Sequence, residues 1–211
     1  MEVENFNEPE ITEEVLNTQE IKGSPKKKKP KKEPETSIAR EILSWVLSFA
    51  VALLATVILK DYVIINANVP TGSMENTIMP GDRLIGNRLA YLWSEPERGD
   101  IVIFHYPDNE NELYVKRIIG LPGETVVIED GKIYINGAEE PLEEPYLKET
   151  WTNRTGPYYF EVPEGSYLML GDNRNDSLDA RYWNNTYVKK EKILGKAVVV
   201  YWPIQNFGKL E

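Results

Sequence analysis

VPTGSM, residues 69–74, places Ser73 directly after Gly72 and three residues after Pro70. A backbone of this composition can make an unusual turn that leaves the serine hydroxyl exposed. Further along the chain, YVKR at residues 114–117 puts Lys116 inside an apolar run that is typical of a β-strand. A lysine is unfavourable in such a run unless the protein uses it. Together the two stretches suggest a nucleophile and its general base.

A serine hydroxyl is a poor nucleophile until a nearby base takes its proton. Histidine usually does this, but the chain has one histidine, His105, and no cysteine. A lysine can replace it only when neutral, and its unperturbed pKa of about 10.4 keeps it charged at pH 7. Burial among apolar neighbours lowers that pKa. A decrease of roughly 2 to 3 units costs about 3 to 4 kcal/mol, which the fold must supply.

The pairing alone is not specific, because a Gly-Ser dipeptide is most often a simple turn and a strand lysine usually points to water. Five short sequence motifs that follow one another in a fixed order make the pairing specific. They are VPTGSM (69–74), PGD (80–82), RGDIV (98–102), YVKRIIG (114–120) and GDNRNDSLDAR (171–181). These residues, in this order, closely resemble the type I signal peptidases of bacteria, the membrane-bound Ser/Lys proteases that release exported proteins from their signal peptides. The resemblance runs from the hydrophobic segment to the C-terminus.

The resemblance implies a reaction for this chain. It identifies Ser73 as the nucleophile and Lys116 as the general base of a serine endopeptidase that works through an acyl-enzyme. It also identifies two oxyanion donors, the Ser73 backbone N–H and the Thr71 hydroxyl.

Further residues match supporting positions of the same family. Ser177 matches a serine that hydrogen-bonds the catalytic lysine, although a plain turn hydroxyl is the alternative. Asp179 and Arg181 match a pair that supports the 171–181 segment. The residues that match substrate-pocket positions, for which core packing is the alternative, are Val69, Met74 and Val115.

His105 is the residue that a conventional Ser-His-Asp triad would need. It sits in an alternating strand pattern, which favours a structural histidine. We therefore predict that the reaction does not use it.

The amino-acid composition restricts the partners and cofactors that the protein can bind. The formal charge is -10, and from Lys60 onward 16 Lys and Arg stand against 24 Asp and Glu. An acidic main domain argues against nucleic acid as a partner. The absence of cysteine excludes disulfides and a thiolate zinc site. Neither a metal-ligand cluster nor a phosphate-binding glycine loop is visible, so we predict no metal and no cofactor.

Residues 42–59 form a stretch without a charged side chain, and this stretch is just long enough for a membrane-spanning helix. We predict a transmembrane helix over 41–62, with an extension toward Ile65 as an option; a buried core helix and a cleavable signal peptide are the alternatives.

The pattern predicts that residues 1–40 form a disordered charged tail. We interpret its lysine run at 26–32 as a juxtamembrane anchor rather than a nucleic-acid patch. Lys and Arg before the span place the tail in the cytoplasm and the larger part outside, as a single-pass protein of the cell membrane in contact with lipid.

Residues 63–211 show the alternating apolar pattern and turn chemistry of strands, so the fold class is mainly β: a signal-peptidase-like β catalytic domain with one N-terminal transmembrane helix. Asp130-Gly131 between two apolar runs predicts a hairpin. Residues 138–165 read as an inserted loop or small subdomain. The cluster of Leu89, Tyr91, Leu92 and Trp93 fits either core packing or a membrane interface.

Two rival functions fit parts of this pattern. A self-cleaving repressor also uses Ser and Lys in a β domain, but carries a DNA-binding domain in place of a membrane span. An inactive, membrane-anchored β domain would bind exported partners, the signal peptides of preproteins included, without cutting them.

Overall fold

The computed structural model describes residues 38–210. The tail predicted for residues 1–40 therefore lies, up to residue 37, outside the described residues. So does the lysine run at 26–32.

The N-terminal apolar segment is helical. α1 (Ile38–Ile58) continues into one turn of π-helix, η2 (Leu59–Val63), and the combined 26 residues are long and apolar enough to cross a membrane. Every α1 side chain is exposed, so the alternative of a buried core helix is wrong. The extension toward Ile65 is present as far as Val63. The helix ends there because Ile64 and Ile65 already pair with strand residues Asn87 and Gly86.

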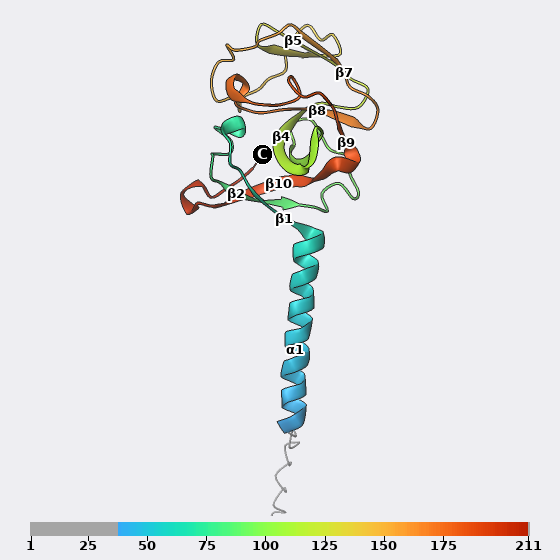
Figure 1. Ribbon diagram of the computed structural model, residues 1–211, viewed down its shortest axis with the longest axis vertical. Helices are drawn as coiled ribbons and strands as arrows, with labels where there is room; N and C mark the ends of the chain where they lie inside the picture. Colours follow the sequence, from blue (N-terminus) through green and yellow to red (C-terminus); the bar gives the residue numbers. More distant parts are fainter. Residues whose placement is uncertain (1–37, 211) are drawn as a thin grey trace, which may run out of the picture. The chain divides into compact units, whose positions relative to one another are not determined.

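The rest of the described chain is built from two antiparallel sheets (Figure 1). The larger contains β1 (Ile64–Asn68), β2 (Arg83–Asn87), β3 (Ile101–Tyr106), β4 (Asn109–Gly120), β8 (Ser166–Leu170), β9 (Val188–Lys189), β10 (Ile193–Trp202) and β11 (Gly208–Lys209). Its order is β1-β2-β10-β3-β4-β8-β9, with β11 paired to β10. The smaller has the order β6-β5-β7, from β5 (Thr125–Glu129), β6 (Lys132–Ile135) and β7 (Tyr158–Glu161). The mainly β fold class is confirmed.

Local sequence accounts for the hairpin that begins the smaller sheet. Asp130 and Gly131 both have positive φ, 49° and 73°. A two-residue turn between antiparallel strands with this handedness needs positive φ at both positions, which Asp-Gly tolerates. The predicted hairpin is confirmed. β7, which completes this sheet inside the region 138–165, was not predicted.

Two hydrophobic cores hold the strands. One joins the sheets: Phe104, Ile118 and Leu168 of the larger sheet pack with Ile128 and Ile133 of the smaller. The other lies among β1, β2, β3 and β10 and includes Met74 and Ile78, which flank the end of the turn that carries Ser73. Burial of these apolar side chains is the main stabilising term for the domain. The second core is therefore what anchors the predicted nucleophile.

The cluster of Leu89, Tyr91, Leu92 and Trp93, predicted as either core or membrane interface, is partly packed and partly exposed. Tyr91 packs against the first core and its hydroxyl donates to Asp100 at 2.8 Å. Leu92 and Trp93 are 60% and 86% exposed. Their contact with a lipid interface remains a prediction.

Candidate active site

Ser73 lies on a short turn that leaves β1. The turn is the 3-10 segment Gly72–Met74, and the chain around it is closed by two backbone bonds, Val69 N–H to the Asp82 carbonyl at 2.9 Å and Gly81 N–H to the Val69 carbonyl at 2.7 Å. Met74 is fully buried below the turn. The turn thus holds the Ser73 side chain in place from both ends, and the side chain is 7% exposed.

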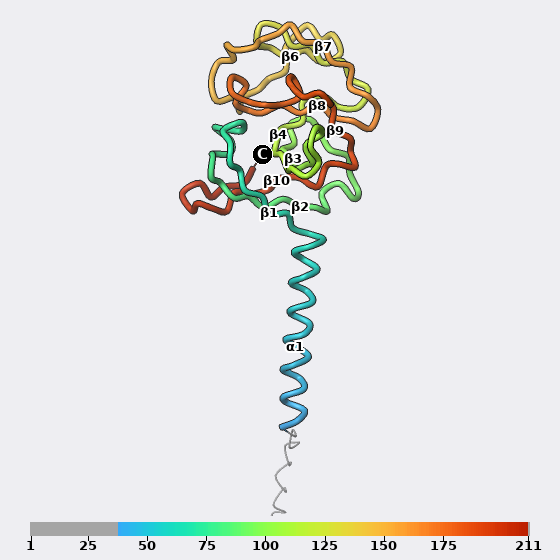
Figure 2. Tube along the Cα trace, viewed as in Figure 1, coloured from blue at the N-terminus to red at the C-terminus, as the bar shows by residue number. Residues whose placement is uncertain are grey.

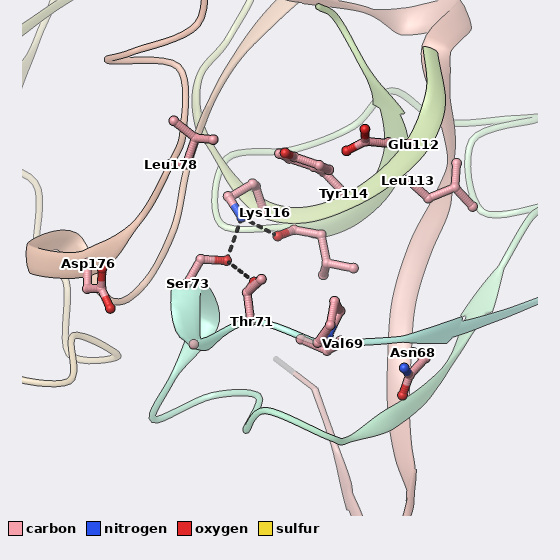
Figure 3. Close-up of a pocket in the computed structure, with 13 residues that line it drawn as sticks. Asn68, Val69, Thr71, Ser73, Glu112, Leu113, Tyr114, Lys116, Asp176 and Leu178 are labelled. Carbon is pink, nitrogen blue, oxygen red and sulfur yellow. Dashed lines mark hydrogen bonds between the residues drawn. The ribbon is translucent and has the colours of Figure 1, made fainter. Parts of the chain in front are cut away.

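Lys116 approaches Ser73 from the middle of β4, opposite Val102 of β3. Its Nζ lies 2.6 Å from Ser73 Oγ and 3.1 Å from the Val115 carbonyl oxygen (Figure 3). Lys116 is 3% exposed. The structure therefore brings together the two residues that the sequence paired, although 43 positions separate them in the chain.

Burial changes the acid–base character of this amine. Removal from water disfavours the ammonium form and lowers the pKa of Lys116 to about 8, against an ordinary value of 10.5. The carboxylates of Asp179 and Asp172 oppose the shift, but each of them is paired with an arginine. A pKa near 8 makes an appreciable fraction of the amine neutral at neutral pH.

A cavity of about 630 Å³ opens in front of Ser73. Its walls come from residues 68–73 on one side and 112–116 of β4 on the other, with Asp176 and Leu178 at the Ser73 end (Figure 3). Val69 and Val115 line it, and their contact with a substrate remains a prediction. Met74 does not line it, because its side chain points into the core, and its assignment to the pocket is wrong.

Thr71 lies beside Ser73. Its Oγ1 lies 3.4 Å from Ser73 Oγ, within the same cavity wall. A hydroxyl in this place can donate a hydrogen bond to an oxygen that develops charge next to Ser73.

The 171–181 segment lies against the Ser73 turn, and the two ranges run side by side in Figure 2. Asn173 N–H donates to the Ser73 carbonyl at 3.1 Å, and the Asn173 side chain donates to the Gly72 carbonyl at 3.0 Å. A Cβ on Gly171 would lie 2.4 Å from the Ser73 carbonyl oxygen. Only a glycine lets the two segments approach this closely.

Asp179 and Arg181 hold that segment in shape. Arg181 donates to Asp179 through both Nε and Nη2 at 2.8 Å, and Asp179 in turn accepts from the Gly171 N–H at 3.1 Å. Both side chains are buried. This geometry fits the supporting role predicted for the pair.

Ser177 differs from what the resemblance implies. Its Oγ is buried and has no hydrogen-bond partner among residues 38–210, so the bond to Lys116 is absent here. The ammonium of Lys116 instead donates to Ser73 and to the Val115 carbonyl. Ser177 instead packs against Gly171, since its Oγ would be 2.2 Å from a Cβ on that glycine.

Comparison with known proteins places the chain. Residues 42–202 match the family model described as signal peptidase, peptidase S26. The chain belongs to this family. A signal peptidase I from Leptolyngbya laminosa is 42% identical over 149 residues, which cover 67% of this chain and 70% of that protein. Signal peptidase IB of Staphylococcus aureus is 33% identical over 184 residues, 80% of this chain and 93% of that one.

Two further signal peptidases are similar. A probable signal peptidase I-2 from Synechocystis sp. is 39% identical over 164 residues, 75% of this chain and 72% of that protein. The crystal structure of a signal peptidase I from Enterococcus faecalis V583 is 37% identical and covers 49% of this chain and 97% of that one, with a TM-score of 0.42. The resemblance to type I signal peptidases is confirmed.

His105 lies away from the cavity that contains Ser73. Its Nδ1 is 2.7 Å from the Glu110 carbonyl oxygen, and its ring lines a separate surface hollow with Lys192. The contacts are those of a structural histidine.

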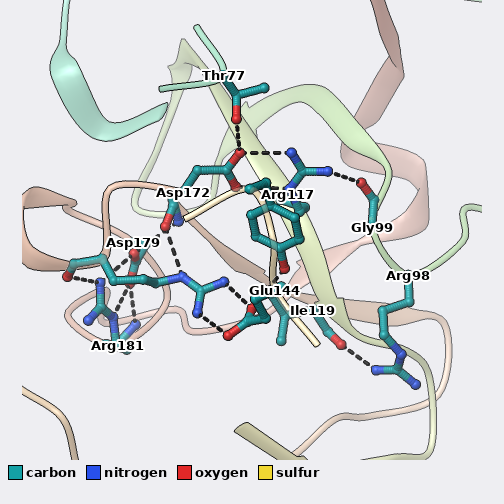
Figure 4. A network of polar contacts seen from close by, with 12 residues as sticks. Thr77, Arg98, Gly99, Arg117, Ile119, Glu144, Asp172, Asp179 and Arg181 are labelled. Atoms are coloured by element: carbon teal, nitrogen blue, oxygen red, sulfur yellow. Dashed lines mark hydrogen bonds and ion pairs between the residues drawn. The ribbon is translucent and has the colours of Figure 1, made fainter. Parts of the chain in front are cut away.

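Sequence reasoning missed several buried ionic groups around Ser73 and Lys116. Arg117 makes two bonds to Asp172, at 2.9 and 2.8 Å, and Asp172 also accepts from the Thr77 hydroxyl at 2.5 Å (Figure 4). Arg174 pairs with Glu144, 30 positions earlier. The available signal was the position of each arginine inside a motif block, but nothing local identifies its partner.

The site offers no obvious place for a metal. Within residues 38–210, no three His, Cys, Asp or Glu side chains are grouped as metal ligands would be.

Proposed function

We propose that this protein is a membrane-bound serine endopeptidase that removes signal peptides from exported preproteins, with Ser73 as nucleophile and Lys116 as general base. One observation carries the proposal: the 2.6 Å approach of a buried, pKa-lowered Lys116 amine to the Ser73 hydroxyl. Membership of the signal peptidase family supports the substrate class.

The first half-reaction forms an acyl-enzyme. The neutral Lys116 amine takes the Ser73 proton while Oγ bonds to the carbonyl carbon of the scissile peptide. The Ser73 N–H and the Thr71 hydroxyl stabilise the negative charge that develops on the carbonyl oxygen. The C–N bond then breaks as the Lys116 ammonium gives its proton to the leaving amine, which becomes the new N-terminus of the mature protein.

The second half-reaction releases the signal peptide. Lys116, neutral again, takes a proton from a water molecule that attacks the ester carbon. The Ser73–carbon bond breaks, Ser73 regains its proton, and the signal peptide leaves with a free carboxylate. The Lys116 amine performs all four proton transfers: from Ser73, to the leaving amine, from water and back to Ser73. Its position therefore affects the rate of every step.

The cavity supports the choice of substrate. A peptide extended between residues 68–73 and 112–116 would bring its scissile carbonyl to Ser73 at one end of the cavity. Val69 and Val115 give this channel apolar walls. Side chains of the signal peptide next to the cut are expected to lie against these walls.

The proposal also includes the membrane topology. Ile38–Val63 would span the bilayer once, with the lysine-rich N-terminal part in the cytoplasm by the positive-inside rule and the β domain outside. Ser73 lies only ten positions beyond Val63, at most roughly 33 to 36 Å of extended chain. The site would therefore stay near the outer membrane surface, where the cleavage site of a membrane-inserted signal peptide is expected.

Cleavage of a model preprotein in detergent or lipid tests the function. The wild type is expected to give one product whose N-terminus begins after the signal peptide, and Ser73→Ala to give none. N-terminal sequencing of the product identifies the cut. Binding of the preprotein without any cleavage would instead indicate an inactive anchored domain.

The pH dependence of the rate tests the role of Lys116. Because the neutral amine is the active form, kcat/KM should rise with pH and level off above an apparent pKa of about 8. Two pH units below that value only about 1% of the amine is neutral, so the rate at pH 6 should be roughly 100-fold below the plateau. Circular dichroism at each pH controls for unfolding. A flat profile from pH 6 to 10 would remove Lys116 as the base.

A further inference from the structure

Residues 136–157 connect β6 to β7 without a strand of their own, and this connection reaches across to the active site. Loops of this length in a compact domain are usually functional or disordered. Three of its side chains make close, buried or part-buried contacts with the site: Glu144, Tyr146 and Trp151. The connection is therefore ordered by the site that it touches.

Glu144 neutralises a buried arginine of the 171–181 segment. Its two oxygens accept from Arg174 Nη2 at 2.6 Å and Nη1 at 3.0 Å, and the side chains are 6% and 1% exposed. Arg174 Nε donates to the Gly171 carbonyl at 3.0 Å. A forked pair of this kind fixes the guanidinium in orientation as well as in charge.

That arginine is connected to Ser73 through the residue that precedes it. Its preceding residue, Asn173, donates to the Ser73 carbonyl, and its own carbonyl accepts from Arg181 Nη2 at 3.0 Å. A change at Arg174 therefore displaces groups that contact Ser73.

Tyr146 makes the second connection, on the side of the lysine. Its ring lies 3.9 Å from the guanidinium carbon of Arg117, the residue after Lys116. Its hydroxyl donates to Glu144 at 2.7 Å, and its carbonyl accepts from the Asn76 side chain at 3.1 Å. Burial raises the pKa of Tyr146 above its ordinary value, so the hydroxyl keeps its proton.

We propose that Glu144 and Tyr146 are positioning residues that hold the Ser73 turn and the Lys116 strand at the separation needed for proton transfer. Residues 144–146 contact a neighbour of each catalytic residue: Arg117 beside Lys116, and Asn76 three positions after Ser73. Glu144 also supports the 171–174 turn that binds Ser73. The proposal rests on the function proposed above, because it assigns these residues a part in that reaction.

Glu144→Gln is the main test. It keeps the size of the side chain and removes the charge that Arg174 needs. Displacements of about 1 Å at a reacting pair can cost about 100-fold in rate, so kcat should fall roughly 10- to 100-fold while KM stays within about threefold. Looser packing admits water to Lys116, and the apparent pKa of kcat/KM should rise above that of the wild type.

Tyr146→Phe is a milder second variant. It keeps the ring on Arg117 and removes only the hydrogen bond to Glu144, so kcat should fall about 3- to 10-fold. Glu124→Gln is the matched control, because it breaks another part-buried ion pair, Arg98–Glu124 at 2.5 Å, that does not contact the Ser73 turn. The control should keep kcat within about twofold of the wild type and leave the pH profile unchanged.

Thermal melts and single-turnover rates, measured well below each melting temperature, separate activity from folded fraction. A folded Glu144→Gln with wild-type kcat and pH profile would overturn the proposal. An equal decrease of kcat in Glu144→Gln and in the control Glu124→Gln would also overturn it. If Glu144→Gln does not fold, Tyr146→Phe decides, and wild-type kcat in that variant overturns the proposal. An inactive wild type would overturn the proposed function and this inference with it, whereas an active wild type with unaffected variants overturns the inference alone.

Discussion

Replacement of Lys116 by alanine is expected to lower kcat/KM by about four orders of magnitude or more, with the fold retained. The amine lies 2.6 Å from Ser73 Oγ, and no second base stands at that hydroxyl among residues 38–210. Its loss removes both the acceptor of the serine proton and the donor to the leaving amine. The measurement is cleavage of a model preprotein, with circular dichroism as the check on folding.

His105→Ala is the control for this prediction. The imidazole contacts the Glu110 carbonyl and lines a different hollow, so this variant should keep most of its activity. A folded His105→Ala without activity, or a Lys116→Ala with wild-type rates, would contradict the Ser/Lys mechanism.

Replacement of Arg117 by alanine is expected to lower the free energy of unfolding by about 3 to 5 kcal/mol. The side chains of Arg117 and Asp172 are 3% and 0% exposed, so the two hydrogen bonds between them replace bonds to water. Without the guanidinium, the Asp172 carboxylate would be a buried charge whose remaining partner is the Thr77 hydroxyl. Urea denaturation followed by tryptophan fluorescence measures the change.

Lys192→Ala is the matched control for that measurement. Lys192 pairs with Glu110 at 2.7 Å, but the two side chains are 34% and 57% exposed. Exposed pairs typically contribute about 0 to 1 kcal/mol because water competes and salt screens them. Equal destabilisation by the two variants would show that burial of the Arg117–Asp172 pair has no special energetic weight.

The strands that local pattern predicted are mostly present. VVIEDGKIYI became the β5–β6 hairpin because Asp130-Gly131 supplies the turn geometry. The apolar run at residues 167–170 lies in β8, which is buried at every position. β7 was missed because its half-exposed residues, Tyr158–Glu161, lie in a region rich in Glu and Pro. It forms a strand because it pairs with β5, which the local sequence does not reveal.

The sequence predicted some contacts of the candidate site and missed others. Ser73 and Lys116 were paired from their local chemistry and motif order, and the structure brings their side chains together. Met74 was misplaced because an apolar residue beside a nucleophile can face either the pocket or the core. The bond expected from Ser177 to Lys116 is absent. The partners of Arg117 and Arg174 lie 55 and 30 positions away, beyond any local pattern.

By itself, the sequence determined the apolar helix, most strands, the hairpin turn and the family, because these depend on neighbouring residues and on motifs in fixed order. Only the tertiary structure decided that the Lys116 amine is dry enough for a pKa near 8, which side of the Ser73 turn Met74 occupies, and that Glu144 reaches Arg174. The reason is physical: desolvation and ion pairing depend on groups distant in the chain that meet only when the sheets pack together.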